Sequence, residues 1–203
     1  MNILAIESAS TICGVALFLN NSLIELDEVN KPRIHGEKLP LAINNILIKY
    51  KLKIADLDGI AVSSGPGSYT GLRIGMSLAK GLAMAENIPI IPVPTLEVMN
   101  HSIIDSGSYY VLLYSHKDLV FTQYYENGRP SSLVTCEVFD KKKFNPRYGF
   151  NMDKIYNLSE NELVSMSAKN VGELALENFK QWANSNLNEV IPNYITEFNL
   201  GKV

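Results

Sequence analysis

The fold is decided by one stretch of the sequence, residues 59–75, which reads GIAVSSGPGSYTGLRIG. Its first part, residues 59–64, is a short apolar run of the kind that forms a buried strand. A glycine turn follows, and residues 70–85 then have the apolar spacing of a helix, in which the only charges are Arg73 and Lys80. A strand, a glycine turn and a helix in this order predict an α/β unit.

The sequence on both sides extends this unit. Residues 2–29 predict a three-stranded antiparallel meander, because short apolar runs alternate with polar turns. Apolar spacing predicts a helix over residues 37–50 and another strand over residues 90–93. Beyond residue 100, the expected elements are strands at 109–114 and 119–125 and a helix at 171–183. We therefore expect an α/β protein with an N-terminal lobe, residues 1–100, and a smaller, degenerate C-terminal lobe, residues 101–203.

The composition excludes several classes of protein. With 18 Lys+Arg against 21 Asp+Glu, the chain is not a basic nucleic-acid platform. A lysine run at 141–143, followed by Arg147, suits either a nucleic-acid contact or a solvated loop, and the second is favoured. Cys13 and Cys136 provide neither a disulfide framework nor a paired metal motif. No basic leader or membrane-length apolar stretch is evident, so we expect a cytoplasmic protein without membrane association.

The glycine turn has two interpretations. Unpaired N–H groups and the helix dipole converge where a strand and a turn lead into a helix, and such a junction can hold an anion. The same glycines suit a tight turn with Ser68 or Thr70 as the helix N-cap, and the spacing alone favours this structural interpretation. The candidate anion or nucleotide contacts, expected at a junction between subunits, are Gly65, Gly67, Ser68, Thr70 and Arg73.

As a family motif, the turn is far more specific. Residues 65–75 closely resemble the Gly-Pro-Gly-Ser-Phe/Tyr-Thr-Gly-Leu-Arg-Ile-Gly stretch of TsaB proteins, also called YeaZ. The segments 3–8, 35–40 and 91–96 are similar to the same family in the same order. The resemblance is strong over the first 100 residues and thins beyond them, where a family-like Asp-Ala-Arg element is missing near Ser115.

This resemblance implies an ASKHA-type (actin/sugar-kinase/Hsp70-like) fold of two lobes, with the second one reduced. It also implies a non-catalytic scaffold that activates the catalytic paralogue TsaD, in a complex with the ATPase TsaE. In that pathway TsaD transfers threonylcarbamoyl to the N6 of adenosine 37 in tRNAs reading A-starting codons, and this subunit meets tRNA through the complex. No cofactor is expected on the subunit alone. The resemblance leaves open ATP or ADP in the assembled complex, and a homodimer of the isolated chain.

Enzyme activity is not expected. TsaD holds its metal with two histidines spaced i and i+4, whereas here His35 is followed by Leu39, so we expect no metal site. One alternative is an ASKHA-type nucleotide-binding ATPase or phosphotransferase, with Glu7 in the acidic position of such folds. Another is a glycoprotease-like peptidase using Ser68 or Thr70, which would need a histidine base oriented by an acid.

Two helices carry the expected partner surface. Helix 37–50 has apolar residues on opposite sides, and helix 70–85 has small residues every fourth position. An ordinary core and an intermolecular interface explain this pattern equally well. The resemblance favours the interface, because TsaB-like proteins join TsaD, or themselves, by packing these helices into a four-helix bundle. The residues expected at this partner interface are His35, Leu41, Ile48, Gly71, Arg73, Gly75 and Ala79.

Overall fold

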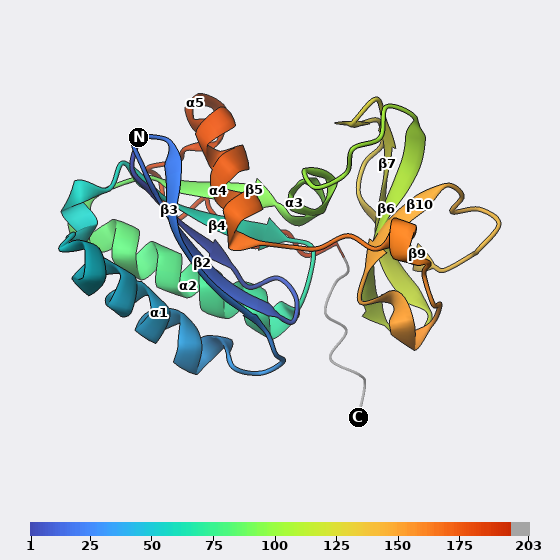
Figure 1. Cartoon of the computed structure of the whole chain (residues 1–203), viewed down its shortest axis with the longest axis horizontal. Coiled ribbons are helices and arrows are strands. Elements are labelled where there is room, and N and C mark those ends of the chain that lie inside the picture. The colour runs from blue at the N-terminus through green and yellow to red at the C-terminus, as the bar shows by residue number, and fades with distance from the viewer. Residues whose placement is uncertain (196–203) are drawn as a thin grey trace.

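The computed structural model describes residues 1–195 and contains two five-stranded sheets, which lie side by side in Figure 1. The first sheet has the strand order β3-β2-β1-β4-β5. Its strands are β1 (Ile3–Glu7), β2 (Ile12–Leu19), β3 (Ser22–Asn30), β4 (Gly59–Gly65) and β5 (Ile90–Pro94). The first three form the expected antiparallel meander, and β4 and β5 extend β1 in parallel. The predicted α/β class is confirmed.

The central strands β1 and β4 are buried along their whole length and are mostly apolar, because both faces of the sheet are covered. Successive side chains of a strand point to opposite faces. In β1, Leu4 and Ile6 pack among the side chains of two long helices, whereas Ile3 and Ala5 pack among those of a later helix. A continuous apolar run in the sequence therefore indicates a strand whose sheet is buried between two helical layers.

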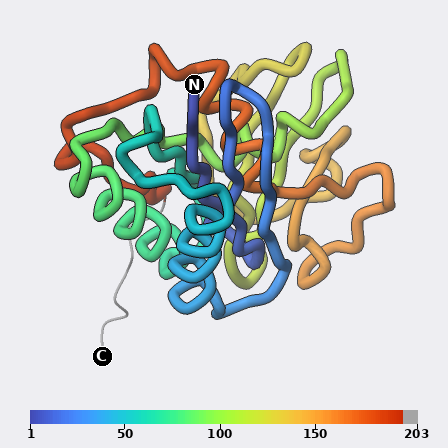
Figure 2. The backbone as a smooth tube through the Cα atoms, turned by 60° about the vertical axis from the view of Figure 1, so that its left-hand side comes forward, coloured from blue at the N-terminus to red at the C-terminus, as the bar shows by residue number. Residues whose placement is uncertain are grey.

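One layer consists of α1 (His35–Tyr50) and α2 (Tyr69–Glu86), which lie side by side over the sheet (Figure 2). In α1, Leu39, Ile43 and Ile46 are buried against the sheet, as their helical spacing predicts. On the opposite side of α1, Leu41 is 51% exposed and Ile48 is 68% exposed. This outward side is not covered by the rest of the described chain.

The small residues of α2 face inward, which corrects their expected place at a partner interface. Gly71, Gly75 and Ala79 are buried between α2 and the sheet. A Cβ on Gly71 would lie 2.1 Å from the backbone oxygen of Ser8, and one on Gly75 would lie 2.1 Å from the Ser8 hydroxyl. The four-residue repeat thus lets α2 approach the chain's own strand β1. Sequence spacing cannot distinguish close packing within a chain from close packing between chains.

We predict that Gly71→Ala destabilises the protein, because its new methyl group would overlap a backbone oxygen that cannot move freely. Overpacking of this kind costs about 1–3 kcal/mol. Gly81→Ala in the same helix is the matched control, since nothing lies within 4 Å of its Cβ position. Alanine there should add up to about 1 kcal/mol of stability through helix propensity. Urea unfolding measures both free energies, and equal effects would contradict the inward packing of α2.

The other face of the sheet is covered by α4 (Ala168–Glu177), followed by α5 (Phe179–Trp182). Residues of α4 therefore pack with the first lobe, although they belong to the segment 101–203 that was expected to form the second lobe. The division at residue 100 fails here because an apolar helix stripe does not specify which sheet it covers. Residues 196–203 of that expected lobe lie outside the described part of the chain. No helix within residues 1–195 is long and apolar enough to cross a membrane.

The second sheet follows α3 (Thr95–Asn100) and has the order β10-β6-β7-β8, with β9 also pairing with β7. Its strands are β6 (Ser108–His116), β7 (Leu119–Glu126), β8 (Arg129–Pro130), β9 (Thr135–Val138) and β10 (Arg147–Phe150). The hairpin of β6 and β7 was predicted, whereas the three shorter strands were not. One face of this sheet packs toward the first lobe, with Tyr109 and Tyr125 joining Ala9 and Leu72 in a shared apolar cluster.

The basic segment at 141–147 has a structural role. Arg147 is buried and donates hydrogen bonds to the carbonyl oxygens of Lys141 and Phe144, which holds the loop against β10. Its guanidinium also forms an ion pair with Glu162, at 3.1 Å. Lys143 pairs with Glu137. Arg147 is therefore not the solvated charge that was expected, whereas Lys141 and Lys142 are exposed, as the solvated-loop interpretation predicts.

Candidate functional site

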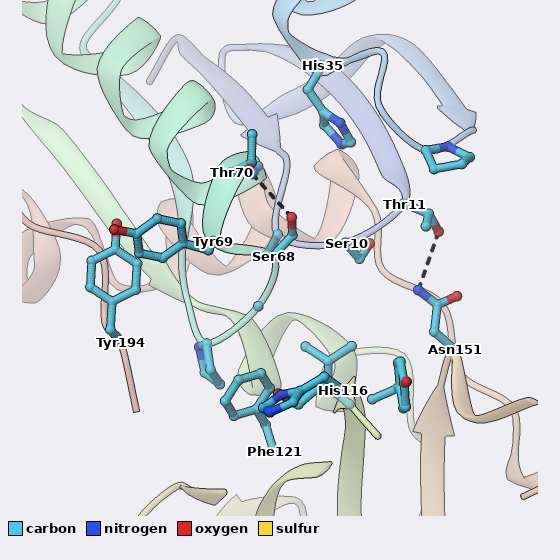
Figure 3. A pocket seen from close by; sticks show the side chains of 18 of the residues that line it. Ser10, Thr11, His35, Ser68, Tyr69, Thr70, His116, Phe121, Asn151 and Tyr194 are labelled. Carbon is cyan, nitrogen blue, oxygen red and sulfur yellow. Dashed lines mark hydrogen bonds between the residues drawn. The ribbon is translucent and has the colours of Figure 1, made fainter. Parts of the chain in front are cut away.

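A cleft of about 1060 Å³ lies between the two lobes. One wall comes from the β1–β2 turn and from the first residues of α1 and α2, and the other comes from the β6–β7 hairpin and the segment after β10. Figure 3 shows His35 and Thr70 on the first wall and His116 and Phe121 on the opposite one. The cleft is therefore built from residues that are far apart in the sequence.

The glycine turn forms part of this cleft. Ser68 caps α2, because its hydroxyl accepts a hydrogen bond from the Gly71 N–H at 3.2 Å, as the structural interpretation predicted. The Ser68 N–H donates to the Ala9 carbonyl at 2.7 Å and ties the turn to the end of β1. Gly65 has a φ of +110°, which favours glycine, and is not among the residues that line the cleft. Gly67, Ser68 and Thr70 line the space between the chain's own lobes.

His35 also faces the cleft and is not at an outward interface, which corrects its expected position. It is the first residue of α1 and is almost fully buried, and its Nε2 lies 2.9 Å from the carbonyl oxygen of Ile12. Leu39, one turn later, lies in the apolar core. Across residues 1–195, no three His, Cys, Asp or Glu side chains cluster closely enough to hold a metal ion.

Two contacts mark opposite ends of the cleft. At one end the Asn151 side chain donates to the Thr11 hydroxyl at 3.4 Å and joins the two lobes (Figure 3). At the other end Tyr194 lies against Tyr69, with ring centroids 5.1 Å apart. None of these four residues was predicted as a site residue. Tyr69 lies within the family motif at 65–75, but the sequence does not show which residue it contacts, because only the fold brings the paired segments together.

Arg73 lies beyond the tyrosine end of the cleft, on the exposed side of α2. Its guanidinium stacks 3.9 Å from the centre of the Tyr69 ring, and its Nε donates to the Tyr194 hydroxyl at 3.2 Å. Arg73 is therefore held by two aromatic rings and does not line the cleft with Ser68 and Thr70. The predicted anion contacts thus divide into a cleft group and a separate, outward-facing arginine.

Glu7 is fully buried at the end of β1. Its two carboxylate oxygens accept hydrogen bonds from the Ala9 N–H and the Ser63 hydroxyl, each at 2.7 Å. Burial raises the pKa of the Glu7 carboxyl from 4.5 to about 7, and these hydrogen bonds only partly offset that rise. The side chain does not line the cleft, so its contacts fit an acid that caps the strand end.

The peptidase alternative gains no support from the hydroxyl groups of the turn. Ser68 uses its oxygen as a helix cap. Among the hydrogen bonds of the described residues, none joins Ser68 or Thr70 to a histidine. A nucleophile activated by a general base would require such a contact.

Glu7 should make stability depend on pH. The Glu7 carboxyl ionises near pH 4.5 in the unfolded chain and near pH 7 in the folded chain. Between these two pH values the folded state therefore holds one more proton than the unfolded state. Stability is therefore highest at low pH and falls as the pH rises through this window. Relative to Glu7→Gln, the natural protein should lose about 2–3 kcal/mol between pH 5 and pH 8.

Urea unfolding of both proteins at the two pH values measures this difference, and the contributions of all other titrating groups cancel in the comparison. Hydrogen bonds made by the substituted amide do not affect the result, because only the change of stability with pH is compared. Parallel pH profiles for the two proteins would show that the buried carboxyl keeps an ordinary pKa.

Comparisons with known proteins identify relatives in sequence. The family model of TsaD, the tRNA N6-adenosine threonylcarbamoyltransferase, matches residues 30–196. The tRNA threonylcarbamoyladenosine biosynthesis protein TsaB of Escherichia coli is 37% identical over 99 residues, which are 49% of this chain and 42% of that protein. TsaB of Bacillus subtilis is also 37% identical over 99 residues, covering 49% and 43%. Each match spans less than half of the relative's own length.

Solved structures agree in fold. A Pseudomonas aeruginosa protein described as similar to peptidase YEAZ superposes with a TM-score of 0.78, at 19% identity, over 96% of this chain and 99% of that one. YeaZ from the same organism gives a TM-score of 0.72 at 18% identity, covering 95% and 99%. At these identities the likeness concerns the fold alone. The chain therefore shares the two-lobed fold of these YeaZ structures.

Proposed function

Because the chain belongs to the TsaB (YeaZ) branch of the TsaD family, we propose that it takes part in tRNA threonylcarbamoyladenosine biosynthesis as a non-catalytic subunit. In this proposal it supports and activates a TsaD-like catalytic subunit. The product is N6-threonylcarbamoyladenosine at position 37 of tRNAs that read A-starting codons. The chain meets tRNA, and a TsaE-like ATPase, through the complex in the cytoplasm.

One observation carries the partner role, namely the outward side of α1 and α2. We call it the α1/α2 outer face and define it by Leu41, Ile48, Ser77, Gly81 and Met84. Leu41 and Ile48 are at least half exposed, and Met84 is 72% exposed. Ser77 and Gly81 are exposed on the same side of α2 and are small enough to let another helix approach closely.

A TsaD-like subunit is the favoured occupant of this face. The family model that matches this chain describes the transferase itself, so the two proteins are expected to share paired helices over a similar sheet. Two such pairs can pack face to face about an approximate two-fold axis, as in an isologous dimer. The same geometry would serve a homodimer of the isolated chain, in which both outer faces come from one sequence.

Catalytic inertness is supported by the composition of the cleft. His35 has no second histidine one helical turn later, because Leu39 holds that position and lies in the core. Among the described residues that line the cleft there is no Asp or Glu, the side chains that usually hold Mg²⁺. In this proposal the subunit alone needs no cofactor, and ATP or ADP enters only with the assembled complex.

Ile48→Asp should weaken binding to the TsaD-like subunit. Burying an isoleucine side chain stabilises a complex by about 1.5–3 kcal/mol, and each 1.4 kcal/mol corresponds to about tenfold in affinity. The substitution should therefore reduce affinity at least tenfold, with further loss from burying a carboxylate. Titration calorimetry with the purified subunit of the same organism measures the dissociation constant.

Ile104→Asp is the matched control, because Ile104 is fully exposed and belongs to the segment between α3 and β6, not to α1 or α2. It should leave affinity unchanged. Complementation then connects the surface to function: cells that depend on the Ile48→Asp variant should contain less threonylcarbamoyladenosine in bulk tRNA than cells with the control. Equal affinity and equal modification for the two variants would refute the proposed partner face.

A further inference from the structure

Residues 190–195, the last described residues of the chain, run along the first lobe and end at the interlobe cleft. We call this segment the terminal strap; it belongs to no helix or strand. Val190 fixes its first end, because this side chain is buried in the apolar core beneath α1 and α2. At the other end, Asn193, Tyr194 and Ile195 line the cleft. The strap is therefore part of the cleft wall and is rooted in the core at its first end.

The glycine turn before α2 is shaped to receive the terminal strap. The Asn193 N–H donates to the Ser64 carbonyl oxygen at 2.7 Å. A Cβ on Gly65 would lie 2.5 Å from the Asn193 backbone oxygen, so a side chain at this position would displace the strap. Ser64 and Gly65 are both buried. The strap thus satisfies a buried backbone carbonyl at the end of β4, which would otherwise need another hydrogen-bond donor.

Three side chains hold the cleft end of the strap. The Arg73 guanidinium stacks on the Tyr69 ring at 3.9 Å, and the Arg73 Nε donates to the Tyr194 hydroxyl at 3.2 Å. The two tyrosine rings lie side by side in Figure 3, with centroids 5.1 Å apart. Arg73 takes part in none of the ion pairs found within residues 1–195, so its charge-assisted hydrogen bond goes to the strap. We call these three side chains the Arg73 clamp.

The contacts at the two ends of the strap differ in burial. The Arg73 side of the clamp is exposed, Tyr194 is 40% exposed, and Ile191 between the two ends is 68% exposed. Val190 is only 3% exposed. Segments with few buried apolar contacts open locally at a lower free energy than the whole molecule. The clamp can therefore break while the first end of the strap stays in the core.

We propose that residues 190–195 open and close one end of the interlobe cleft by local unfolding, and that the Arg73 clamp holds them closed. In the closed state the Asn193 N–H is bonded to Ser64 and the strap forms part of the cleft wall. In the open state this bond and the bond from Arg73 to Tyr194 are both broken, and the Ser64 carbonyl faces water. Arg73 is thus a positioning residue that acts through Tyr194. Opening is a property of the isolated chain, so the proposal does not depend on the partner role.

The Asn193 amide reports closure, because its hydrogen bond to Ser64 exists only when the strap is seated. Amide hydrogen exchange measured residue by residue by NMR on the isolated chain therefore tests the clamp. Arg73→Met keeps a long side chain but removes the guanidinium. It should speed exchange at Asn193 by about tenfold or more, because a charge-assisted hydrogen bond and a cation–π contact are lost together. Lys80→Met, which removes the other cation of α2, is the matched control and should leave this rate unchanged.

The Ile60 amide provides a reference within the sheet. It donates to the Pro89 carbonyl oxygen at 3.0 Å, and Ile60 is completely buried. In the natural protein, exchange at Ile60 should be slower than at Asn193 by about tenfold or more, because the strap opens without the core. Arg73→Met should leave the Ile60 rate unchanged. Exchange of Asn193 as slow as that of Ile60 would mean that the strap opens only with the whole molecule and would overturn the proposal.

Variants of Tyr194 separate the two contacts of the clamp. Tyr194→Phe removes the hydroxyl and keeps the ring, so it should speed exchange at Asn193 less than Tyr194→Ala does. Adding Arg73→Met to Tyr194→Ala should change the rate little further, because both residues act through one contact. Equal Asn193 rates in Arg73→Met and Lys80→Met would refute the role of the clamp. Should Arg73→Met fail to fold, an unchanged Asn193 rate in Tyr194→Ala would refute it instead.

Discussion

The close contact between α2 and the end of β1 is the constraint on which the rest of the structure depends. Gly71 and Gly75 lie directly over Ser8, at distances that leave no room for a side chain. This contact fixes the height and rotation of α2 above the sheet. The first turn of the helix is therefore directed at the interlobe cleft, and Gly81 and Met84 are turned outward. One packing contact thus orients both the wall of the interlobe cleft and the α1/α2 outer face.

Local pattern was sufficient for most of the fold. The meander, both long helices and the β6–β7 hairpin follow from apolar spacing and turn residues, which act over short distances in sequence. The short strands β8, β9 and β10 were missed because segments of two to four residues carry too little periodicity. The place of α4 was missed for a different reason, since its apolar stripe fits either sheet and only long-range packing selects the first.

The candidate site was predictable only where the chain's own turn builds it. Ser68 and Thr70 were identified from the strand, turn and helix around them, and they do line the cleft. His35 and Gly71 were expected at the partner interface, but His35 faces the cleft and Gly71 packs against Ser8, because a motif identifies a residue without giving its direction. Asn151 and Tyr194 could not be predicted as site residues, because each belongs to the site through a contact with a residue from a distant part of the sequence.

The cleft and the outer face are two sides of the same helices. His35 begins α1 at the cleft, and Ile48 lies near the far end of the same helix on the outward side. In α2, Thr70 lines the cleft, and Gly81 lies about three turns later on the outer face. Helices packed this tightly on a sheet move as rigid elements and not residue by residue. Any contact that moves the first turns of α1 and α2 relative to the second lobe must therefore also move the α1/α2 outer face.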